Sequence, residues 1–252
     1  MKITTKFYSE NLKRDVNLYI YIPSNYNSDS HVIFMHDGNN AFEDELASFG
    51  TGWKMAEVLQ GDENLNDYIV VGFGCNEDTK RYSEYCIFDN DPNYFDGNIK
   101  TNGEAHVEFV TKELYNFIKQ EYNLKLEFDK CHIMGSSMGG LSSLVIGLKN
   151  PTLFKYVHCV SNAFFYNLPE LEKFIDELKV TNKEQCFYLD TGTEECSSGK
   201  DFRLDYINSN KLISKKLNEL GLDVTLKIIE GAEHNERFWN KRLKDILLFK
   251  KN

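Results

Sequence analysis

The sequence predicts an α/β fold in which a mostly parallel sheet is covered by helices on both faces. Segments rich in β-branched and aromatic residues alternate with helical stretches along most of the chain. Two further strand-like segments lie close together near the N-terminus and alternate in polarity, which is typical of an antiparallel hairpin. No linker rich in Pro, Gly or Ser divides the chain, so we expect a single domain over residues 1–252.

Eight segments carry the strand pattern. They are 2–9, 16–23, 31–36, 68–74, 130–135, 155–161, 185–191 and 223–230. The first two make the predicted hairpin. The later ones are separated by helical stretches, as expected for parallel strands, whose connections must cross the sheet.

Four stretches are predicted to be helical, namely 104–122, 141–150, 206–221 and 236–249. Apolar residues recur near helical spacing in the first, the second stops before a proline, and the third ends on a glycine that is typical of a helix C-terminus. Segments 75–103 and 161–184 follow predicted strands without a clear pattern of their own. Ligands of open α/β sheets bind where the chain leaves the carboxyl ends of strands, so both segments are candidates to lie near a site.

The charge of the chain argues against some classes of partner. The net charge is −10 and the pI about 5.2, with Lys and Arg spread along the sequence rather than gathered in a basic stripe. Neither a nucleic acid nor an anionic membrane surface is therefore an expected partner. No apolar run approaches the length of a membrane span, and the N-terminal residues lack the apolar core of a secretory signal. We expect a cytoplasmic protein.

The six cysteines show no CxxC spacing, and several lie within strand-like apolar runs. This pattern favours buried free thiols in a reducing compartment over disulfides. A zinc site built on Cys131 and His132 is the weaker alternative. We expect neither a metal nor a cofactor.

The segment GSSMGG, residues 135–140, contains the pattern G-x-S-x-G in one register, which makes Ser137 the central serine. Ordinary Gly and Ser usage produces this pattern by chance in about one chain in ten, so the motif alone is weak evidence. Its context is stronger, because a predicted strand precedes it and a predicted helix follows. A sharp strand-to-helix turn needs small residues on both sides of an exposed nucleophile. We therefore predict a nucleophile elbow rather than a simple glycine-rich loop.

A serine hydroxyl needs a base, usually a histidine oriented by a carboxylate. Of the six histidines, only His234 lies in the loop between the last predicted strand and the last predicted helix. Enzymes with such elbows keep the chain order Ser, acid, His, which His234 fits. The acid is then expected after the seventh strand, where the turn contains four carboxylates. They are Asp190, Glu194, Glu195 and Asp201. Spacing alone does not choose among them.

An oxyanion hole for this chemistry takes one backbone N–H from the residue after the nucleophile and one from the loop after the third strand. The first donor is Met138. The second is expected from the sequence HDGNN, as Asn39 or Gly38. His36 and Asp37 are then structural supports of that loop.

Seven stretches together resemble a known family. They are YIPSNY (21–26), HVIFMHDGNNAF (31–42), GTGWKMAEVL (50–59), RYSEY (81–85), GSSMGGLSS (135–143) with the following P-x-x-F, YLDTGTEE (188–195) and EGAEHNERFW (230–239). Over most of its length the chain is similar to the Putative esterase family of the α/β-hydrolase superfamily, which includes esterase D-like, feruloyl, acetyl-sugar and siderophore esterases. The resemblance implies the α/β-hydrolase fold, with serine, acid and histidine after the fifth, seventh and eighth strands.

The resemblance also implies roles for individual residues. The last position of G-T-x-E/D makes Glu195 the triad acid, although family members often carry Asp there. Trp53, Arg81, Tyr82 and Tyr85 fall at positions near the substrate pocket of the family. The alternative for these four is packing, or an ion pair of Arg81 with Glu84 or Asp78.

The expected function is that of a serine esterase acting on small soluble esters through Ser137, His234 and Glu195. Two alternatives remain. The same triad could transfer an acyl group to an acceptor other than water, or cleave thioesters, and an inactive scaffold could bind a ligand in the same pocket. The sequence does not determine the acyl specificity, the alcohol specificity or the oligomeric state.

Overall fold

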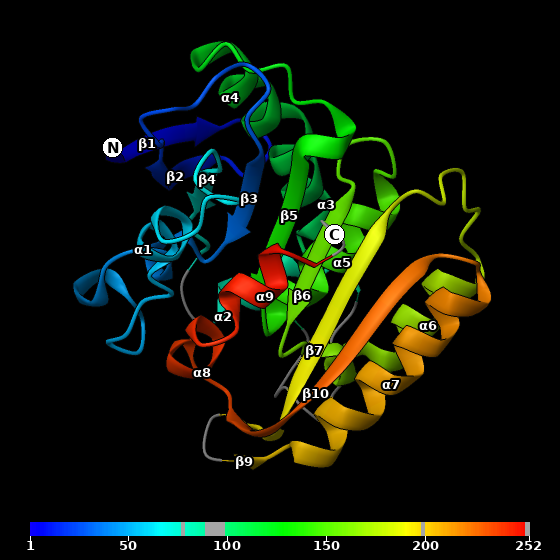
Figure 1. Ribbon diagram of the computed structural model, residues 1–252. Coiled ribbons are helices and arrows are strands. Elements are labelled where there is room, and N and C mark those ends of the chain that lie inside the picture. The colour runs from blue at the N-terminus through cyan, green and yellow to red at the C-terminus, as the bar shows by residue number, and fades with distance from the viewer. Residues whose placement is uncertain (77–78, 89–98, 198–199, 250–252) are drawn as a thin grey trace.

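The computed structural model describes residues 1–76, 79–88, 99–197 and 200–249, and shows an eight-stranded mixed sheet (Figure 1). The strands are β1 (Lys2–Ser9), β2 (Arg14–Tyr21), β3 (Val32–His36), β4 (Ile69–Phe73), β5 (Cys131–Ser136), β6 (Tyr156–Val160), β7 (Cys186–Glu194) and β10 (Asp223–Glu233). Their spatial order is β1-β2-β4-β3-β5-β6-β7-β10. All eight predicted strands are present, and the α/β-hydrolase architecture is confirmed.

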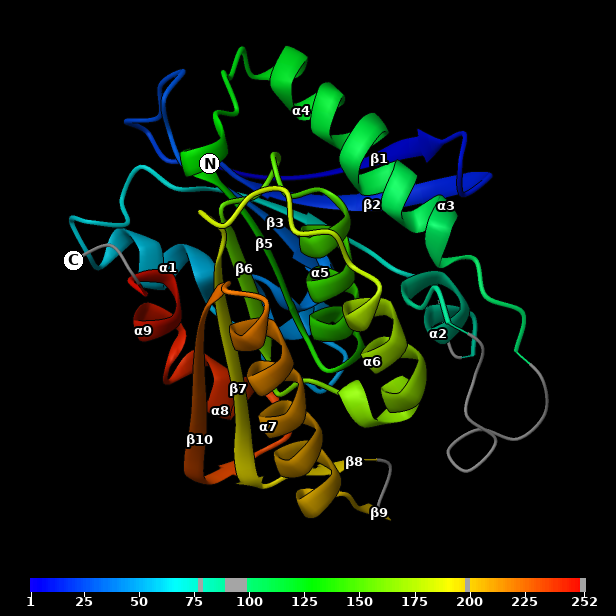
Figure 2. The ribbon, with the colours of Figure 1, turned by 90° about the vertical axis from the view of Figure 1, so that its right-hand side faces the viewer.

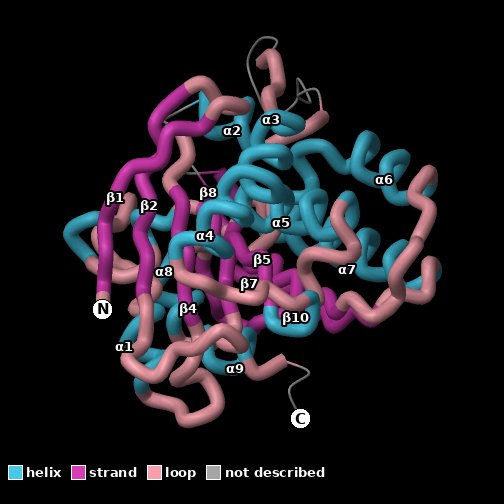
Figure 3. Tube along the Cα trace, turned by 90° about the horizontal axis from the view of Figure 1, so that it is seen from above, coloured by secondary structure: helices cyan, strands magenta, loops and turns pink. Residues whose placement is uncertain are grey.

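The predicted hairpin forms the antiparallel part of the sheet. Strand β1 pairs antiparallel with β2, with Lys2 opposite Tyr21 and Ser9 opposite Arg14, and β2 pairs antiparallel with β4. From β4 onward every pairing in this sheet is parallel. Seen from above, β1 and β10 lie at opposite edges (Figure 3). The carboxyl ends of β3, β5, β7 and β10 therefore point the same way, which brings the predicted site residues to one edge.

Helices cover both faces of the sheet (Figure 2). One face carries α3 (Gly103–Glu108), α4 (Tyr115–Glu121), α5 (Met138–Lys149), α6 (Leu168–Asp176) and α7 (Arg203–Glu219). The other face carries α1 (Met55–Gln60), α8 (Glu236–Asn240) and α9 (Leu243–Leu247). The short helix α2 (Thr79–Tyr85) packs against α3 and α5.

The two faces have separate cores because alternate residues of a strand point to opposite sides. In β3, Val32 and Phe34 join the core under α5, whereas Ile33 and Met35 join the core under α1 and α9. All five residues of β3 are buried, as expected for a central strand that is covered on both sides.

The helices differ from prediction at several boundaries. The stretch predicted over 104–122 contains a π-helical turn, Phe109–Leu114, between α3 and α4, and the hydroxyl of Thr111 donates to the carbonyl of Val107 there. The last predicted helix is two short ones, because the chain turns at Arg242 and sends its guanidinium into the core. A small hairpin of β8 (Cys196–Ser197) and β9 (Lys200–Asp201) was not expected.

The two unassigned segments are partly helical. The segment 161–184 contains the 3-10 turn Phe164–Asn167 and α6, and the segment 75–103 contains α2, while its residues 77–78 and 89–98 lie outside the described part. None of the helices in the described ranges is long and apolar enough to cross a membrane.

Candidate active site

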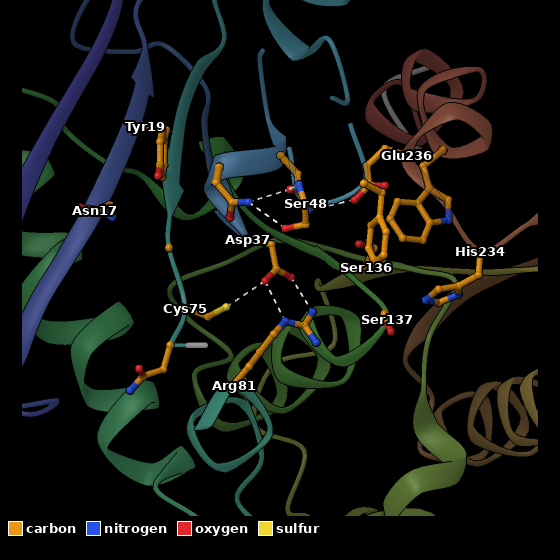
Figure 4. Close-up of a pocket in the computed structure, with 16 residues that line it drawn as sticks. Asn17, Tyr19, Asp37, Ser48, Cys75, Arg81, Ser136, Ser137, His234 and Glu236 are labelled. Carbon is orange, nitrogen blue, oxygen red and sulfur yellow. Dashed lines mark hydrogen bonds and ion pairs between the residues drawn. The ribbon is translucent and has the colours of Figure 1, made fainter. Parts of the chain in front are cut away.

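Ser137 occupies the turn between β5 and α5 with φ 56° and ψ −123°. A side chain other than glycine rarely adopts this conformation, and such strain is concentrated at functional sites. The turn is tight as well, because a Cβ on Gly135 would lie 2.4 Å from the backbone carbon of Gly139. The small residues of the motif are thus required by the backbone, and Ser137 faces a cavity (Figure 4).

His234 and Glu195 form a charge-assisted hydrogen bond. His234 follows β10, Glu195 follows β7, and Nδ1 of His234 lies 2.6 Å from Oε2 of Glu195. The other oxygen of Glu195 accepts hydrogen bonds from the backbone N–H of Gly192 (2.7 Å) and the hydroxyl of Thr191 (3.4 Å). Burial by itself raises the pKa of Glu195, but the hydrogen bonds and the nearby imidazole bring the pKa below its ordinary value. Glu195 is therefore held as a carboxylate.

The other carboxylates of the turn point elsewhere. Glu194 is exposed and lies 3.3 Å from a guanidinium nitrogen of Arg203, which also pairs with Asp201 at 2.6 Å. Asp190 is fully buried and forms a bidentate ion pair with Arg242, at 2.7 and 3.0 Å. Glu195 is thus the one of the four that meets the imidazole.

A buried network connects Asp190 to Glu195 through Ser161. The side-chain oxygen of Ser161 accepts hydrogen bonds from Arg242 (3.1 Å) and from the indole N–H of Trp239 (2.8 Å). The hydroxyl of Ser161 is also near Glu195 and helps to lower the pKa of that carboxyl. Asp190 therefore supports the surroundings of Glu195 and does not itself contact the imidazole.

Tyr206, on α7, lies close to both Ser137 and His234. Its hydroxyl is 3.4 Å from Nε2 of His234, Ser137 is near enough to influence the pKa of this hydroxyl, and the ring is fully buried. Figure 4 shows the imidazole of His234 beside Ser137. Sequence analysis did not identify Tyr206 as a site residue, and no motif marks it; its position depends on how α7 packs against the sheet.

The two predicted oxyanion donors lie in separate helical segments, Met138 at the start of α5 and Asn39 within a 3-10 turn. Met138 is the first residue of α5, so its N–H has no acceptor within the helix. Asn39 lies in the 3-10 turn Gly38–Asn40 after β3 and lines the cavity beside Ser137. The side chain of Asn39 donates to the side chain of Asn40 (2.8 Å) and to the hydroxyl of Ser48 (3.1 Å). These hydrogen bonds fix the loop that carries the second predicted donor.

The cavity has a volume of about 670 Å³, and about half of its wall is polar. Ser137, His234, Asn39 and Arg81 all line it, so it gathers predicted residues from four separate parts of the chain. Hydroxyl and amide side chains form much of the remaining wall; they include Asn17, Tyr19, Asn40, Ser48, Asn76 and Ser136.

Arg81 lines the cavity but already has a partner. Its guanidinium contacts both carboxylate oxygens of Asp37, at 2.9 and 2.7 Å, rather than Glu84, while Asp78 lies outside the described residues. Burial raises the pKa of Asp37, but Arg81 outweighs this and holds the pKa below its ordinary value. Asp37 also has a left-handed backbone (φ 54°), and together with its buried neighbour His36 it fixes the loop before Asn39.

Tyr85, Tyr82 and Trp53 occupy other positions than the predicted pocket wall. The hydroxyl of Tyr85 accepts from the N–H of Asp37 (3.1 Å) and donates to its carboxylate (3.3 Å), so Tyr85 holds Asp37 from behind. Tyr82 is buried and bonds to Asn167. Trp53 is 1% exposed and stacks on Trp239, with ring centroids 5.4 Å apart, and only the latter lines the cavity. These three aromatic residues pack behind the wall.

Glu236 is a buried residue of the cavity wall that sequence analysis missed. It lies two residues after His234, is 1% exposed and accepts a hydrogen bond from the amide of Asn40 (2.9 Å) through Oε1. Its Oε2 has no hydrogen-bond partner among the described residues. Burial, reinforced by the charge of Asp37, raises the pKa of Glu236 to about 7. The sequence gives no signal that singles it out, because Glu230 and Glu233 also lie near the histidine.

Cys131 and His132 point to opposite faces of β5. Cys131 contacts the hydroxyl of Tyr115, whereas His132 bonds to His31 and His158, each at 3.0 Å. Within the described ranges, no three His, Cys, Asp or Glu side chains converge as ligands for a metal ion. All six cysteines are free thiols.

Comparison with protein families shows to which class of enzymes the protein belongs. The model of the Putative esterase family matches residues 9–249. The chain belongs to this family. It is thereby an esterase, in the class of carboxylic-ester hydrolases, and the relationship extends over both cores of the fold.

Individual members of the family and similar structures are distant in sequence. The Bacillus subtilis (strain 168) protein YbbA is 21% identical over 241 residues, which cover 92% of each chain. The structure of the enterobactin esterase FES from Shigella flexneri has a TM-score of 0.77 and 17% identity, with 98% of this chain covering 58% of that one. The BES protein from Bacillus cereus has a TM-score of 0.71 and 20% identity, covering 98% and 94% of the two chains. At these identities the structures show a common fold.

Proposed function

We propose that this esterase is a serine carboxylesterase with the triad Ser137, His234 and Glu195. The contact between His234 and Glu195, 2.6 Å long and fully buried on the acid's side, carries the proposal, because it orients an imidazole beside a serine held in an elbow. The carboxylate fixes Nδ1 as the protonated nitrogen and leaves Nε2 free to accept the proton of the serine hydroxyl.

In the first half of the reaction, Oγ of Ser137 attacks the ester carbonyl while Nε2 of His234 takes its proton. The negative charge that develops on the carbonyl oxygen is stabilised by the N–H groups of Met138 and Asn39, and the start of α5 adds a partial positive charge. The imidazolium then gives its proton to the departing alcohol. Glu195 stabilises the imidazolium throughout.

In the second half, water attacks the acyl-enzyme and His234 again acts as base and then acid. No step of this mechanism requires a group beyond the side chains and backbone amides named here. The amide and hydroxyl side chains of the cavity wall favour small esters that carry hydrogen-bonding groups over long-chain lipid esters.

The proposal is tested by hydrolysis of chromogenic acetate, butyrate and octanoate esters. Ser137→Ala is expected to lower kcat for the short esters by on the order of 10⁴ or more, because the nucleophile is lost. Ser136→Ala is the matched control, since Ser136 adjoins the nucleophile and lines the same cavity. The variant is expected to stay within a few-fold of the wild type.

Two other outcomes would favour the alternative functions. If added alcohols capture the acyl group in preference to water, the protein is an acyltransferase. An inactive wild type that also fails to react with serine-directed phosphonates would indicate a ligand-binding scaffold.

A further inference from the structure

A second cavity, of about 560 Å³, adjoins the first at His234. It shares Phe49, His234 and Glu236 with the first cavity, and its remaining wall comes from Thr51, the end of β10 and the helix α8. His234 therefore belongs to the walls of two adjoining cavities. An ester held at Ser137 can place its two halves in different cavities.

The chemistry of the proposed reaction determines which half of the ester each cavity holds. The first cavity holds Ser137 and Asn39, which act on the carbonyl carbon and its oxygen. The second is lined by His234 and its following residues and not by Ser137. Because the leaving alcohol must receive its proton from His234, the alcohol half is the one directed to the second cavity.

Two cations lie in the wall of the second cavity. Arg237 and Lys241 are one helical turn apart, both are exposed, and neither has a carboxylate within ion-pair distance among the described residues. Nearby cations are paired instead: Lys244 with Asp62 at 2.6 Å, and Arg242 with Asp190 at 2.7 Å. Two unpaired cations beside the active site of a chain with a net charge of −10 mark a local anion-attracting surface.

The carboxylates of this wall are Glu233 and Glu236. Glu236 is buried and bonded to Asn40, and its raised pKa keeps a large part of it neutral near pH 7. Glu233 is exposed and bonds to the amide of Asn235 at 3.3 Å. The wall of the second cavity thus carries two exposed positive charges and one exposed negative charge.

Two aromatic rings border the same space. Phe49 is 74% exposed and contributes to both cavities, and Phe238 lies under the ammonium group of Lys241, 4.6 Å from ring centroid to nitrogen. An exposed phenylalanine beside a catalytic histidine offers an apolar face to a ring or methylene chain of the ligand.

We propose that the second cavity binds the alcohol half of the substrate, and that this half carries a carboxylate which pairs with Arg237 and Lys241. The preferred substrates are then esters of hydroxy acids in which the hydroxyl oxygen is acylated. Hydrolysis converts such an ester and water into a free acid and the hydroxy acid. This assignment rests on the proposed serine esterase activity.

The test compares two esters with the same acyl group, 4-(butyryloxy)benzoate and its methyl ester, whose leaving groups differ in charge. The measured quantity is the ratio of kcat/KM for the anionic ester to that for the neutral one, at low ionic strength. The double variant Arg237→Gln/Lys241→Gln is expected to lower this ratio at least tenfold, and 0.5 M NaCl is expected to lower it in the wild type. Glu233→Gln is expected to raise it.

Lys244→Gln is the matched control, because it removes one positive charge from the neighbouring helix α9 outside both cavities. It is expected to leave the ratio unchanged. A binding measurement supplements the kinetics: calorimetry of 4-(butyryloxy)benzoate with Ser137→Ala should show at least tenfold weaker binding when the two cations are also removed.

A ratio that the double variant leaves unchanged would overturn the assignment of the second cavity while the esterase proposal stands. Failure of the wild type to hydrolyse either ester would instead overturn the esterase proposal and, with it, this assignment.

Discussion

Glu236 is buried near the proposed catalytic histidine, although carboxylates are costly to bury. Its burial raises the pKa from the ordinary 4.5 to about 7, so the folded protein binds a proton at Glu236 more tightly than the unfolded chain does. The associated stabilisation is fully present below pH 4.5 and is lost as the pH rises through 7. Above pH 7 the folded state carries the cost of a buried charge.

Glu236→Gln removes this pH dependence and keeps the acceptor for Asn40. The free energy of unfolding of the variant, relative to the wild type, is expected to increase by on the order of 2–3 kcal/mol between pH 5 and pH 8. Urea denaturation of both proteins at several pH values measures the difference. A constant difference across this range would show that Glu236 is not protonated in the folded state.

The residues of the candidate site differ in how well their positions could be predicted from the sequence. Ser137 was predictable because the elbow imposes small neighbours at fixed offsets, and His234 because it alone follows the last strand. Glu195 and Glu194 could not be separated by spacing, since adjacent side chains diverge and only the fold decides which one turns inward. Tyr206 reaches the site by tertiary packing alone, a contact that leaves no local pattern.

At the scale of the elements, the buried pair of Asp190 and Arg242 ties strand β7 to the turn between α8 and α9. This pair explains why the C-terminal segment is broken into α8 and α9: a continuous helix over 236–249 fits the apolar spacing, but the turn at Arg242 brings its guanidinium to Asp190 and Ser161. A helix boundary of this kind is set by a long-range ion pair and could not be predicted from local preferences.

Removing one member of the Asp190–Arg242 pair should lower the free energy of unfolding more than removing both. Arg242→Met is expected to lower the free energy of unfolding by about 3–5 kcal/mol, because Asp190 is left as an uncompensated buried charge. Asp190→Asn/Arg242→Met is expected to recover part of this loss. Urea denaturation of the two single variants and the double variant gives the coupling energy, and additive losses would contradict a direct interaction.

At the scale of the whole molecule, the architecture was predictable because hydrophobic patterning and chain order agree. Alternating strands and helices require a parallel sheet covered on both faces, and the short N-terminal strands allow a hairpin. The crossing that places β4 between β2 and β3 could not be predicted from these patterns, since segment order does not determine spatial order.

The two-faced core also buries histidines, which makes the whole fold sensitive to acid. Burial lowers the pKa of His36 to about 4 and that of His158 to about 3, from the ordinary 6.5. Both are therefore neutral in the folded protein, and the unfolded chain takes up protons first as the pH falls below 6.5. Each group then costs about 1.4 kcal/mol of stability per pH unit until its folded pKa is reached.

We expect the free energy of unfolding to fall by on the order of 5 kcal/mol between pH 6.5 and pH 4.5 through these two groups, which is comparable with the total stability of a typical domain. Glu236 acts in the opposite direction over the same range, so Glu236→Gln should steepen the loss. His158→Gln should make the loss shallower by about 1.4 kcal/mol per pH unit, because one proton-binding site of the unfolded chain disappears. Denaturation profiles at successive pH values measure these slopes. If His158→Gln leaves the slope of the wild type unchanged, His158 is protonated in the folded state and acid lability has its origin elsewhere.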